Sequence, residues 1–295
     1  MSQNKNWKVL ELLNTTSKFL EQKGIENPRL NTEQLLGKVL NLSRVELYVS
    51  FERPLGPSEL GDFRQLVKRR ANRDPLQYIL GETEFMGLPF EVSPAALIPR
   101  PETEVLVEEV LKLKPEFETK QTIIVDVGTG SGCIPVSLAH YWKDAGCVGL
   151  DISDLALDLA KRNAQKNKTE AQLEFHIYDI FKEWNSGLPQ DVHILVSNPP
   201  YIAKGELEGL QAEVVDFEPR IALTDEGDGL RFYRRLFELC ADPSAPHCTY
   251  LFLEMSGSQP QKIIDLAGSY KFGKIEQIND LNGIPRVLKV KVKNG

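Results

Sequence analysis

A glycine-rich turn between an expected strand and an expected helix constrains the fold of this chain more than any other feature. Residues 123–127 form an apolar run, residues 128–132 contain three glycines, and a helical pattern follows near 132–142. Glycine tolerates positive φ and lets the backbone approach a ligand closely. A strand, a glycine turn and a helix in this order are typical of the ligand-binding edge of an open α/β sheet.

Strands and helices alternate through the second part of the chain, which predicts an α/β fold with a doubly wound, mostly parallel sheet. The loop at 279–286 is too short for a helical crossover, so the last two strands should be antiparallel. Seven strands with an antiparallel last one resemble the Rossmann-like sheet of class I S-adenosylmethionine-dependent methyltransferases. The expected strands are 123–127, 147–150, 173–178, 192–197, 250–254, 274–278 and 287–292, with helices near 103–113, 132–142, 154–166, 228–240 and 259–268.

The first part of the chain has a different, helical pattern. A length of 295 residues suits about two domains. Residues 1–82 show apolar side chains at helical spacing, interrupted by turns, which predicts a small bundle of four short helices. Residues 83–97 are expected to form a hairpin linker around Gly87, and residues 98–295 a catalytic domain.

A basic run lies on the last helix of the expected bundle. It consists of Lys68, Arg69, Arg70 and Arg73. Such a run is either a solvated helix face or a patch that docks a partner. The sequence leaves both interpretations open.

Composition excludes several classes of protein. Lys and Arg number 35 against 42 Asp and Glu, a net charge of −7, which disfavours a general binder of nucleic acid. No apolar run is long enough to span a bilayer, and residues 1–8 lack the apolar core of a signal peptide. Four cysteines without Cys-x-x-Cys spacing and four scattered histidines predict a cytoplasmic protein with reduced thiols and no metal site.

Carboxylates next to the glycine turn indicate which ligand it binds. Asp151 ends the second strand, nineteen residues after Gly132, where a carboxylate can accept hydrogen bonds from ribose hydroxyls. Asp126 immediately precedes the turn region, where it would repel a pyrophosphate but attract the cationic end of a methionine moiety. The third glycine also comes one residue early for a dinucleotide fingerprint. Both features favour S-adenosylmethionine over NAD. Asp179, after the third strand, is either an acceptor for an adenine amine or an exposed turn residue.

The fourth strand leads into Asn198-Pro199-Pro200-Tyr201. Ligands of open α/β sheets bind beyond the carboxyl ends of the strands, so this loop should face the methyl donor. Prolines carry no N–H, so the loop offers backbone carbonyls and the Asn198 side-chain oxygen as acceptors. Two acceptors suit a planar –NH₂ group, on which Tyr201 can stack. The alternative is a Pro-Pro turn that merely ends a strand.

Further motifs make the chain resemble the release factor glutamine methyltransferases, the HemK-like family. The resemblance spans nearly the whole chain. The motifs are Pro75-Leu76-Gln77-Tyr78-Ile79-Leu80-Gly81, Ile98-Pro99-Arg100-Pro101-Glu102-Thr103-Glu104, residues 126–132, Asn198–Tyr201, Glu218-Pro219-Arg220, Asp228-Gly229-Leu230 and Asp280-Leu281-Asn282-Gly283 with Arg286.

The resemblance implies an enzyme that moves a methyl group from S-adenosylmethionine to a glutamine side-chain amide. That glutamine is in the Gly-Gly-Gln motif of class I peptide chain release factors, which act in translation termination. Donor contacts carried over by motif are Asp126, Gly128, Thr129, Gly130, Ser131, Gly132, Asp151, Asp179, Ile180 and Asn198. The implied glutamine pocket comprises Asn198, Pro199, Pro200 and Tyr201, with Arg100 and Glu102 at its mouth.

Three points stay open at this level. Arg100 and Glu102 could equally be charges at a helix N-terminus, and Ser256 stands where the family usually has glycine. The same pocket would also suit an adenine-amine methyltransferase acting on nucleic acid, which would flip its base into it. A non-catalytic nucleoside-binding partner protein is the third possibility. The expectation is a release factor as protein substrate, with no direct nucleic acid and no membrane as partner.

Overall fold

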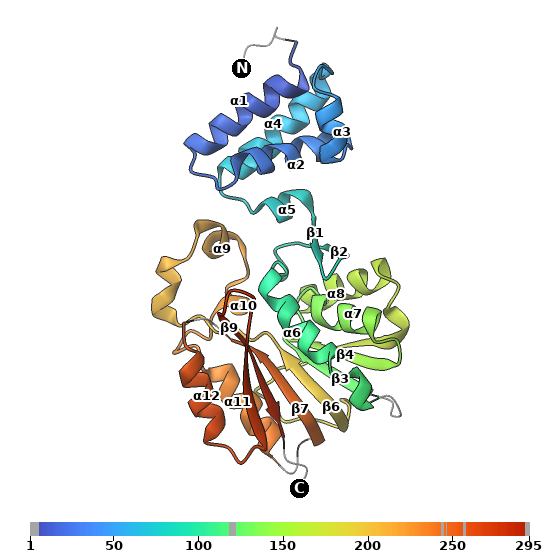
Figure 1. Cartoon of the computed structure of the whole chain (residues 1–295), viewed down its shortest axis with the longest axis vertical. Coiled ribbons are helices and arrows are strands. Elements are labelled where there is room, and N and C mark those ends of the chain that lie inside the picture. Colours follow the sequence, from blue (N-terminus) through green and yellow to red (C-terminus); the bar gives the residue numbers. More distant parts are fainter. Residues whose placement is uncertain (1–5, 118–121, 243–244, 246, 256–257, 293–295) are drawn as a thin grey trace. The chain divides into compact units, whose positions relative to one another are not determined.

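The computed structural model describes residues 6–117, 122–242, 245, 247–255 and 258–292, and the chain divides into two compact units (Figure 1). The first unit comprises Met1–Gly81 and Gln211–Phe217, and the second Glu82–Leu210 and Glu218–Gly295. Within the described residues, no helix is both long and apolar enough to cross a membrane.

The first unit is helical, as its apolar spacing predicts. Its buried centre contains Leu12, Leu13, Leu35, Leu36 and Phe63. Its helices are α1 (Val9–Gln22), α2 (Pro28–Leu40), α3 (Arg44–Val49), α4 (Pro57–Ala71), α5 (Leu76–Leu80) and α9 (Ala212–Phe217). The four predicted helices are confirmed as α1 to α4. Helices α5 and α9 were not predicted, because their five and six residues are too few to show a helical period.

Helix α9 is joined to this unit by ion pairs. The Glu213 carboxylate accepts hydrogen bonds from Arg70 at 3.1 Å and Arg73 at 3.2 Å. Arg69 pairs with Asp74 at 2.7 Å. Arg73 lies beyond the end of α4, and Lys68, Arg69 and Arg70 lie on it; three of these four cations are therefore engaged inside the unit.

The second unit begins with a hairpin formed by β1 (Glu82–Phe85) and β2 (Leu88–Glu91). Its turn passes through Gly87 at φ +70°, a conformation that glycine adopts without strain. Phe85 and Phe90 pack edge to face, 6.0 Å apart, within the core of this unit. The hairpin is thus built into the second unit by its buried side chains.

A seven-stranded sheet forms the body of the second unit, in the order β5-β4-β3-β6-β7-β9-β8. Pairing from β5 to β7 is parallel, and β9 runs antiparallel to both β7 and β8. The antiparallel last pair and the class I methyltransferase-like fold are as predicted. The strands are β3 (Thr122–Val127), β4 (Ala145–Asp151), β5 (Leu173–Ile177), β6 (Asp191–Ser197), β7 (His247–Glu254), β8 (Lys274–Asn279) and β9 (Pro285–Lys291).

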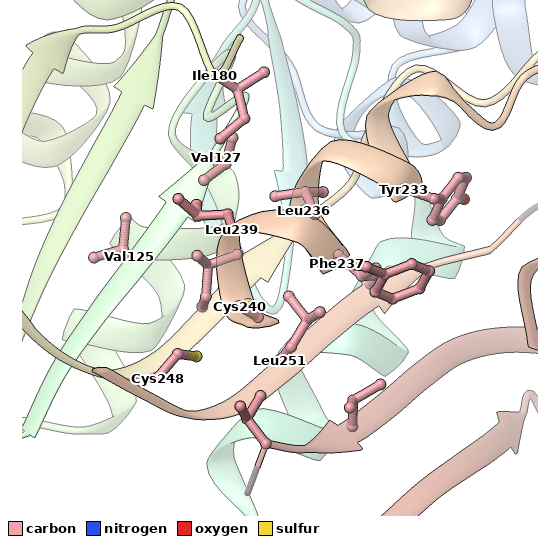
Figure 2. Close-up of a cluster of buried hydrophobic side chains, with 14 of the residues drawn as sticks. Val125, Val127, Ile180, Tyr233, Leu236, Phe237, Leu239, Cys240, Cys248 and Leu251 are labelled. Carbon is pink, nitrogen blue, oxygen red and sulfur yellow. The ribbon is translucent and has the colours of Figure 1, made fainter. Parts of the chain in front are cut away.

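Helices cover both faces of this sheet, because the buried strands are apolar on both sides. Figure 2 shows one face, where Leu236, Phe237 and Leu239 of α11 lie against Val125 and Leu251. On the other face, helices α6 and α7 pack on alternate strand residues. The helices are α6 (Pro101–Leu111), α7 (Cys133–Tyr141), α8 (Asp154–Lys166), α10 (Arg220–Leu223), α11 (Arg231–Ala241) and α12 (Pro260–Gly268), with short 3₁₀ turns at Lys114–Phe117, Glu170–Gln172 and Lys204–Gly209.

Candidate active site

A cavity of about 720 Å³ lies in the second unit, beyond the carboxyl ends of β3, β4, β5 and β6. This is where an open α/β sheet binds its ligands, and the volume is in the range of cofactor pockets. Its wall includes most of the residues that the sequence selected: Arg100, Gly128, Thr129, Gly130, Ser131, Asp151, Asp179, Ile180, Asn198, Pro199 and Pro200. Four other selected residues, all described in the structure, lie outside this lining: Asp126, Gly132, Tyr201 and Glu102.

The glycine turn forms one wall of the cavity. Gly128 and Gly130 have φ values of +76° and +53°, which side chains rarely adopt. The backbone N–H of Gly128 donates to the carbonyl of Leu150 at 2.8 Å, which ties the turn to β4. Gly132 has a packing role: a Cβ there would lie 2.9 Å from the Cβ of Ala160, so glycine lets α7 begin close to α8.

Asp151 is held by the glycine turn at the end of β4. One carboxylate oxygen accepts from the N–H of Gly130 at 2.8 Å, and the other accepts from the N–H of Ser153 at 2.9 Å. Partial burial raises the pKa of this carboxyl above its usual value, while these backbone donors act in the opposite direction. Each oxygen keeps lone-pair capacity for a ligand hydroxyl.

Asp126 is fully buried on β3, behind the turn. Neither of its carboxylate oxygens has a hydrogen-bond partner among the described residues. Burial raises its pKa to about 7, the nearby Thr129 hydroxyl acts in the opposite direction, and the nearby charge of Asp151 adds to the rise. A buried carboxylate without partners favours a positive charge or a hydrogen-bond donor close by.

The wall beyond β5 combines an aspartate with aromatic rings. Asp179 accepts the N–H of Phe181 at 3.0 Å and so closes a tight turn, while it also lines the cavity. The Phe181 ring contacts Phe232 edge to face at 5.2 Å, and the Arg231 guanidinium lies 4.1 Å from the centre of that ring. Sequence reasoning missed these aromatic and cationic side chains, although Phe181 directly follows the selected Asp179-Ile180 pair.

Asn198 follows β6 and lines the cavity. Its amide nitrogen donates to the hydroxyl of Thr103 at 3.2 Å, so its side-chain oxygen is the acceptor left for a ligand. Pro199 and Pro200 line the cavity beside it. The Tyr201 side chain instead packs against the hydrophobic core, and its hydroxyl donates to Glu254 at 3.3 Å. Its proposed stacking on a substrate remains a prediction.

Glu254, at the end of β7, is a buried acid that sequence reasoning missed. It accepts from Thr103 at 2.6 Å, and burial raises its pKa to about 7, although its hydrogen bonds with Thr103 and Tyr201 act in the opposite direction. A signal was available: Glu254 ends an apolar strand, as Asp151 does and as Asp126 nearly does. What the sequence could not show is that this end lies next to Asn198.

The two charged residues expected at the mouth behave differently. Arg100 lines the cavity and donates to the buried carboxylate of Glu218 at 2.5 Å. Glu102 faces Arg286 at 3.7 Å. Ser256 lies outside the described residues. In the described part of the chain, no group of three His, Cys, Asp or Glu side chains could hold a metal ion.

Comparison with known proteins defines the family. Residues 11–81 match the PrmC N-terminal domain, and residues 101–227 match the methyltransferase small domain. In solved structures, the chain resembles the human METTL16 catalytic domain bound to an RNA hairpin, with a TM-score of 0.57 at 17% identity over 78% of this chain and 82% of that one. A METTL16 domain in complex with SAH gives 0.51 at 17% identity over 77% and 84%. At such low identity, these two likenesses show the fold.

Curated relatives match nearly end to end. The release factor glutamine methyltransferase of Geobacter sulfurreducens is 42% identical over 96% of both chains. The protein of the same name from Chlorobaculum tepidum is 38% identical over 98% of both chains, and that of Moorella thermoacetica is 43% identical over 86% of this chain and 88% of its own. On these matches, the chain belongs to the release factor glutamine methyltransferase family.

Proposed function

We propose that this enzyme transfers a methyl group from S-adenosylmethionine to the side-chain amide nitrogen of the glutamine in the Gly-Gly-Gln motif of class I peptide chain release factors. The observation that carries the proposal is the position of Asn198. Asn198 lines the same cavity as the glycine turn and Asp151, and its amide nitrogen is engaged by Thr103, which leaves its oxygen as the acceptor for a ligand. The relatives, which carry that enzyme name, support the choice of substrate. Because release factors act in translation, the proposed site of action is the cytoplasm.

The acceptor groups at the cavity support S-adenosylmethionine as its ligand. Asp151 supplies acceptors for the ribose hydroxyls, and Asp179 with Ile180 lies where the adenine is expected. The unpartnered carboxylate of Asp126 offers a negative potential behind the turn, which suits a cationic ligand. When bound, this cofactor supplies an electrophilic methyl group on a positively charged sulfur.

The chain's own contribution to the chemistry is to position the acceptor nitrogen. Asn198 Oδ1 and a backbone carbonyl of the loop accept the two hydrogens of the glutamine –NH₂ group. Those bonds orient the nitrogen toward the donor and disfavour the amide resonance that occupies its lone pair. As the N–CH₃ bond forms, the S–CH₃ bond would break and S-adenosylhomocysteine would leave as a neutral thioether. The nitrogen's proton becomes acidic as the bond forms and would leave to water, so no base is needed before attack. Positioning and electrostatics therefore account for the catalysis.

The direct test is a methyl-transfer assay with labelled donor and two substrates. One is an intact class I release factor, and the other is the same factor with its Gly-Gly-Gln glutamine replaced by alanine. We expect label in the first and none in the second. Equal labelling of both, or labelling of nucleic acid in preference to the factor, would contradict the proposal and favour the adenine-amine alternative.

Replacement of Asp151 by alanine is expected to weaken donor binding. Charge-assisted hydrogen bonds contribute about 1.5–3 kcal/mol each, so the Kd should rise about 10- to 100-fold. Calorimetry on the full chain measures this. Asp158→Ala, on α8 and outside the cavity lining, makes the same charge change and should leave the Kd unaltered. An unchanged Kd for Asp151→Ala would refute the assignment.

For the domains, we propose that the bundle of residues 1–82 recognises the release factor, the hairpin of 83–97 links it, and residues 98–295 carry out catalysis. A single glutamine side chain offers little surface, so selectivity must come from contacts outside its pocket. On the bundle, a groove of about 270 Å³ between α1 and α4 has an apolar floor and three cationic side chains: Lys23, Arg64 and Lys68. None of the three forms an ion pair within the described residues, unlike Arg69, Arg70 and Arg73.

These cations predict a contact with acidic side chains of the release factor. The double variant Arg64→Glu with Lys68→Glu should raise the KM for the intact factor about tenfold, because exposed charge pairs contribute up to ~1 kcal/mol each. Steady-state kinetics with intact factor, and with a short peptide that carries the same glutamine, check this. Peptide turnover and donor Kd should not change.

The control reverses two other exposed lysines, Lys18 and Lys271, which do not line the groove. It produces the same net charge as the test variant. If both double variants raise the KM equally, the effect is one of overall charge and the groove has no special role.

A further inference from the structure

A chain of buried hydrogen bonds runs behind the acceptor of the candidate site. Asn198 donates its amide N–H to the Thr103 hydroxyl at 3.2 Å, and that hydroxyl donates to Glu254 Oε2 at 2.6 Å. Thr103 and Glu254 are each only 2% exposed. The three residues come from α6, the loop after β6 and the end of β7. These two hydrogen bonds therefore join three separate elements at the cavity wall.

The direction of these bonds follows from the chemistry of the groups. When Glu254 is ionised, its carboxylate oxygen at 2.6 Å takes the single hydrogen of the Thr103 hydroxyl. The Thr103 oxygen then faces Asn198 with lone pairs alone. Only the –NH₂ end of the Asn198 amide can bond to lone pairs, so its Oδ1 must point elsewhere. Glu254, through Thr103, thus determines which end of the amide is presented to the cavity.

Glu254 is itself held firmly. Its second oxygen accepts from the Tyr201 hydroxyl at 3.3 Å, and its backbone carbonyl accepts from the Tyr233 hydroxyl at 2.7 Å. Two charged groups act on it from neighbouring elements: Arg286 of β9 favours its ionised form, and Glu102 of α6 opposes it. Because both the side chain and the backbone of Glu254 are held, its carboxylate can fix the orientation of the hydroxyl that bonds to it.

We propose that Thr103 and Glu254 are positioning residues for methyl transfer, which fix the Asn198 amide with its oxygen toward the acceptor nitrogen. The inference rests on the proposed function, in which that nitrogen belongs to a glutamine –NH₂ group. If the Asn198 amide were reversed, its own –NH₂ group would face that of the glutamine. Two donors would then oppose each other, and the acceptor that orients the nitrogen would be lost.

The first test is Thr103→Val, which keeps the shape of the side chain and removes its hydroxyl. We expect kcat on intact release factor to fall about 10- to 100-fold, by analogy with the loss when the hydrogen-bond partner of a metal ligand is removed. The donor Kd should not change. Thr103→Ser restores the hydroxyl and should recover most of kcat, which a role in packing alone would not predict. Ser137→Ala is the control, since it removes a fully buried hydroxyl that has no hydrogen-bond partner among the described residues.

The second test asks whether Thr103 acts through Asn198. Residues that act through one another give non-additive effects in a double-mutant cycle. Thr103→Val combined with Asn198→Ala should therefore be no slower than Asn198→Ala alone. Losses that multiply, or normal kcat in Thr103→Val, would overturn the inference. The wild-type chain in the same assay distinguishes failure of this inference from failure of the proposed function. If the wild type leaves the glutamine unmodified, it is the proposed function that fails.

Discussion

Asn198→Ala is expected to lower kcat on intact release factor by about 10²–10³-fold, the usual loss when one preorganised transition-state contact is removed. The variant loses the side-chain oxygen that the Thr103 hydrogen bond directs into the cavity. The glutamine nitrogen then keeps one acceptor of two and is no longer held in line with the methyl group. Single-turnover kinetics with saturating donor measure the effect.

Donor affinity serves as the internal control for this variant. The glycine turn and Asp151, which we assign to the donor, are untouched, so calorimetry should show a nearly unchanged Kd. Near-normal turnover would mean that Asn198 merely ends a strand. A large loss of donor affinity would mean that its main contact is with the cofactor.

The second large effect concerns stability and its dependence on pH. Burial raises the pKa of Asp126 to about 7 from an ordinary value of 3.8. Below the ordinary value, the carboxyl is protonated in both the folded and the unfolded chain, and no stability is lost. As pH rises toward 7, the unfolded chain releases the proton more readily than the folded one, so stability falls. The loss is on the order of 4 kcal/mol once the pH exceeds the folded-state value.

Asp126→Asn removes that titration. We expect the variant to unfold at higher urea concentration than the wild type at pH ~8 without donor, and the two to converge toward pH ~4. Glu254 titrates in an overlapping range, from 4.5 to about 7, but it is present in both proteins and drops out of the difference. The same variant should bind S-adenosylmethionine more weakly, because it lacks the negative potential behind the turn. A variant that is no more stable at high pH would contradict the burial argument, and one with unaltered donor Kd would contradict the electrostatic role.

Most of the catalytic fold could be predicted because its signals are local. The central strands β3, β6 and β7 contain long apolar runs, β5 and β8 alternate apolar with polar residues, and the strand boundaries differ from prediction by at most three residues. The antiparallel last pair followed from a loop too short for a crossover. The position of the cavity could be predicted because the glycine turn follows β3 and Asn198 follows β6, and these two strands are neighbours in the sheet.

What could not be predicted depends on contacts between distant parts of the chain. Thr103 and Glu254 are 151 residues apart, and they meet because α6 packs on β7 and β9. Nothing in either local sequence specifies that meeting. The basic run is a second example of such distant contacts. Arg70 forms an ion pair with Glu213, which lies 143 positions later in the chain, so the sequence around Arg70 does not reveal the pair. Lys68 lacks such a partner within the described residues, and the local sequence does not distinguish the two.

The place of β9 in the sheet has a consequence for biosynthesis. This strand is inserted between β7 and β8, and β8 stands at the edge with β9 as its neighbour. While residues Pro285–Lys291 of a nascent chain are still inside the ribosome, β9 cannot form. One edge of β7 then has no pairing partner, and β8 cannot join the sheet. Exposed strand edges of that kind pair readily with other chains. Glu254 lies at the end of β7, where β9 pairs with it, so the positioning of Asn198 is completed only after synthesis has passed this last described strand. A premature stop before Pro285 should thus yield an aggregating chain with no activity.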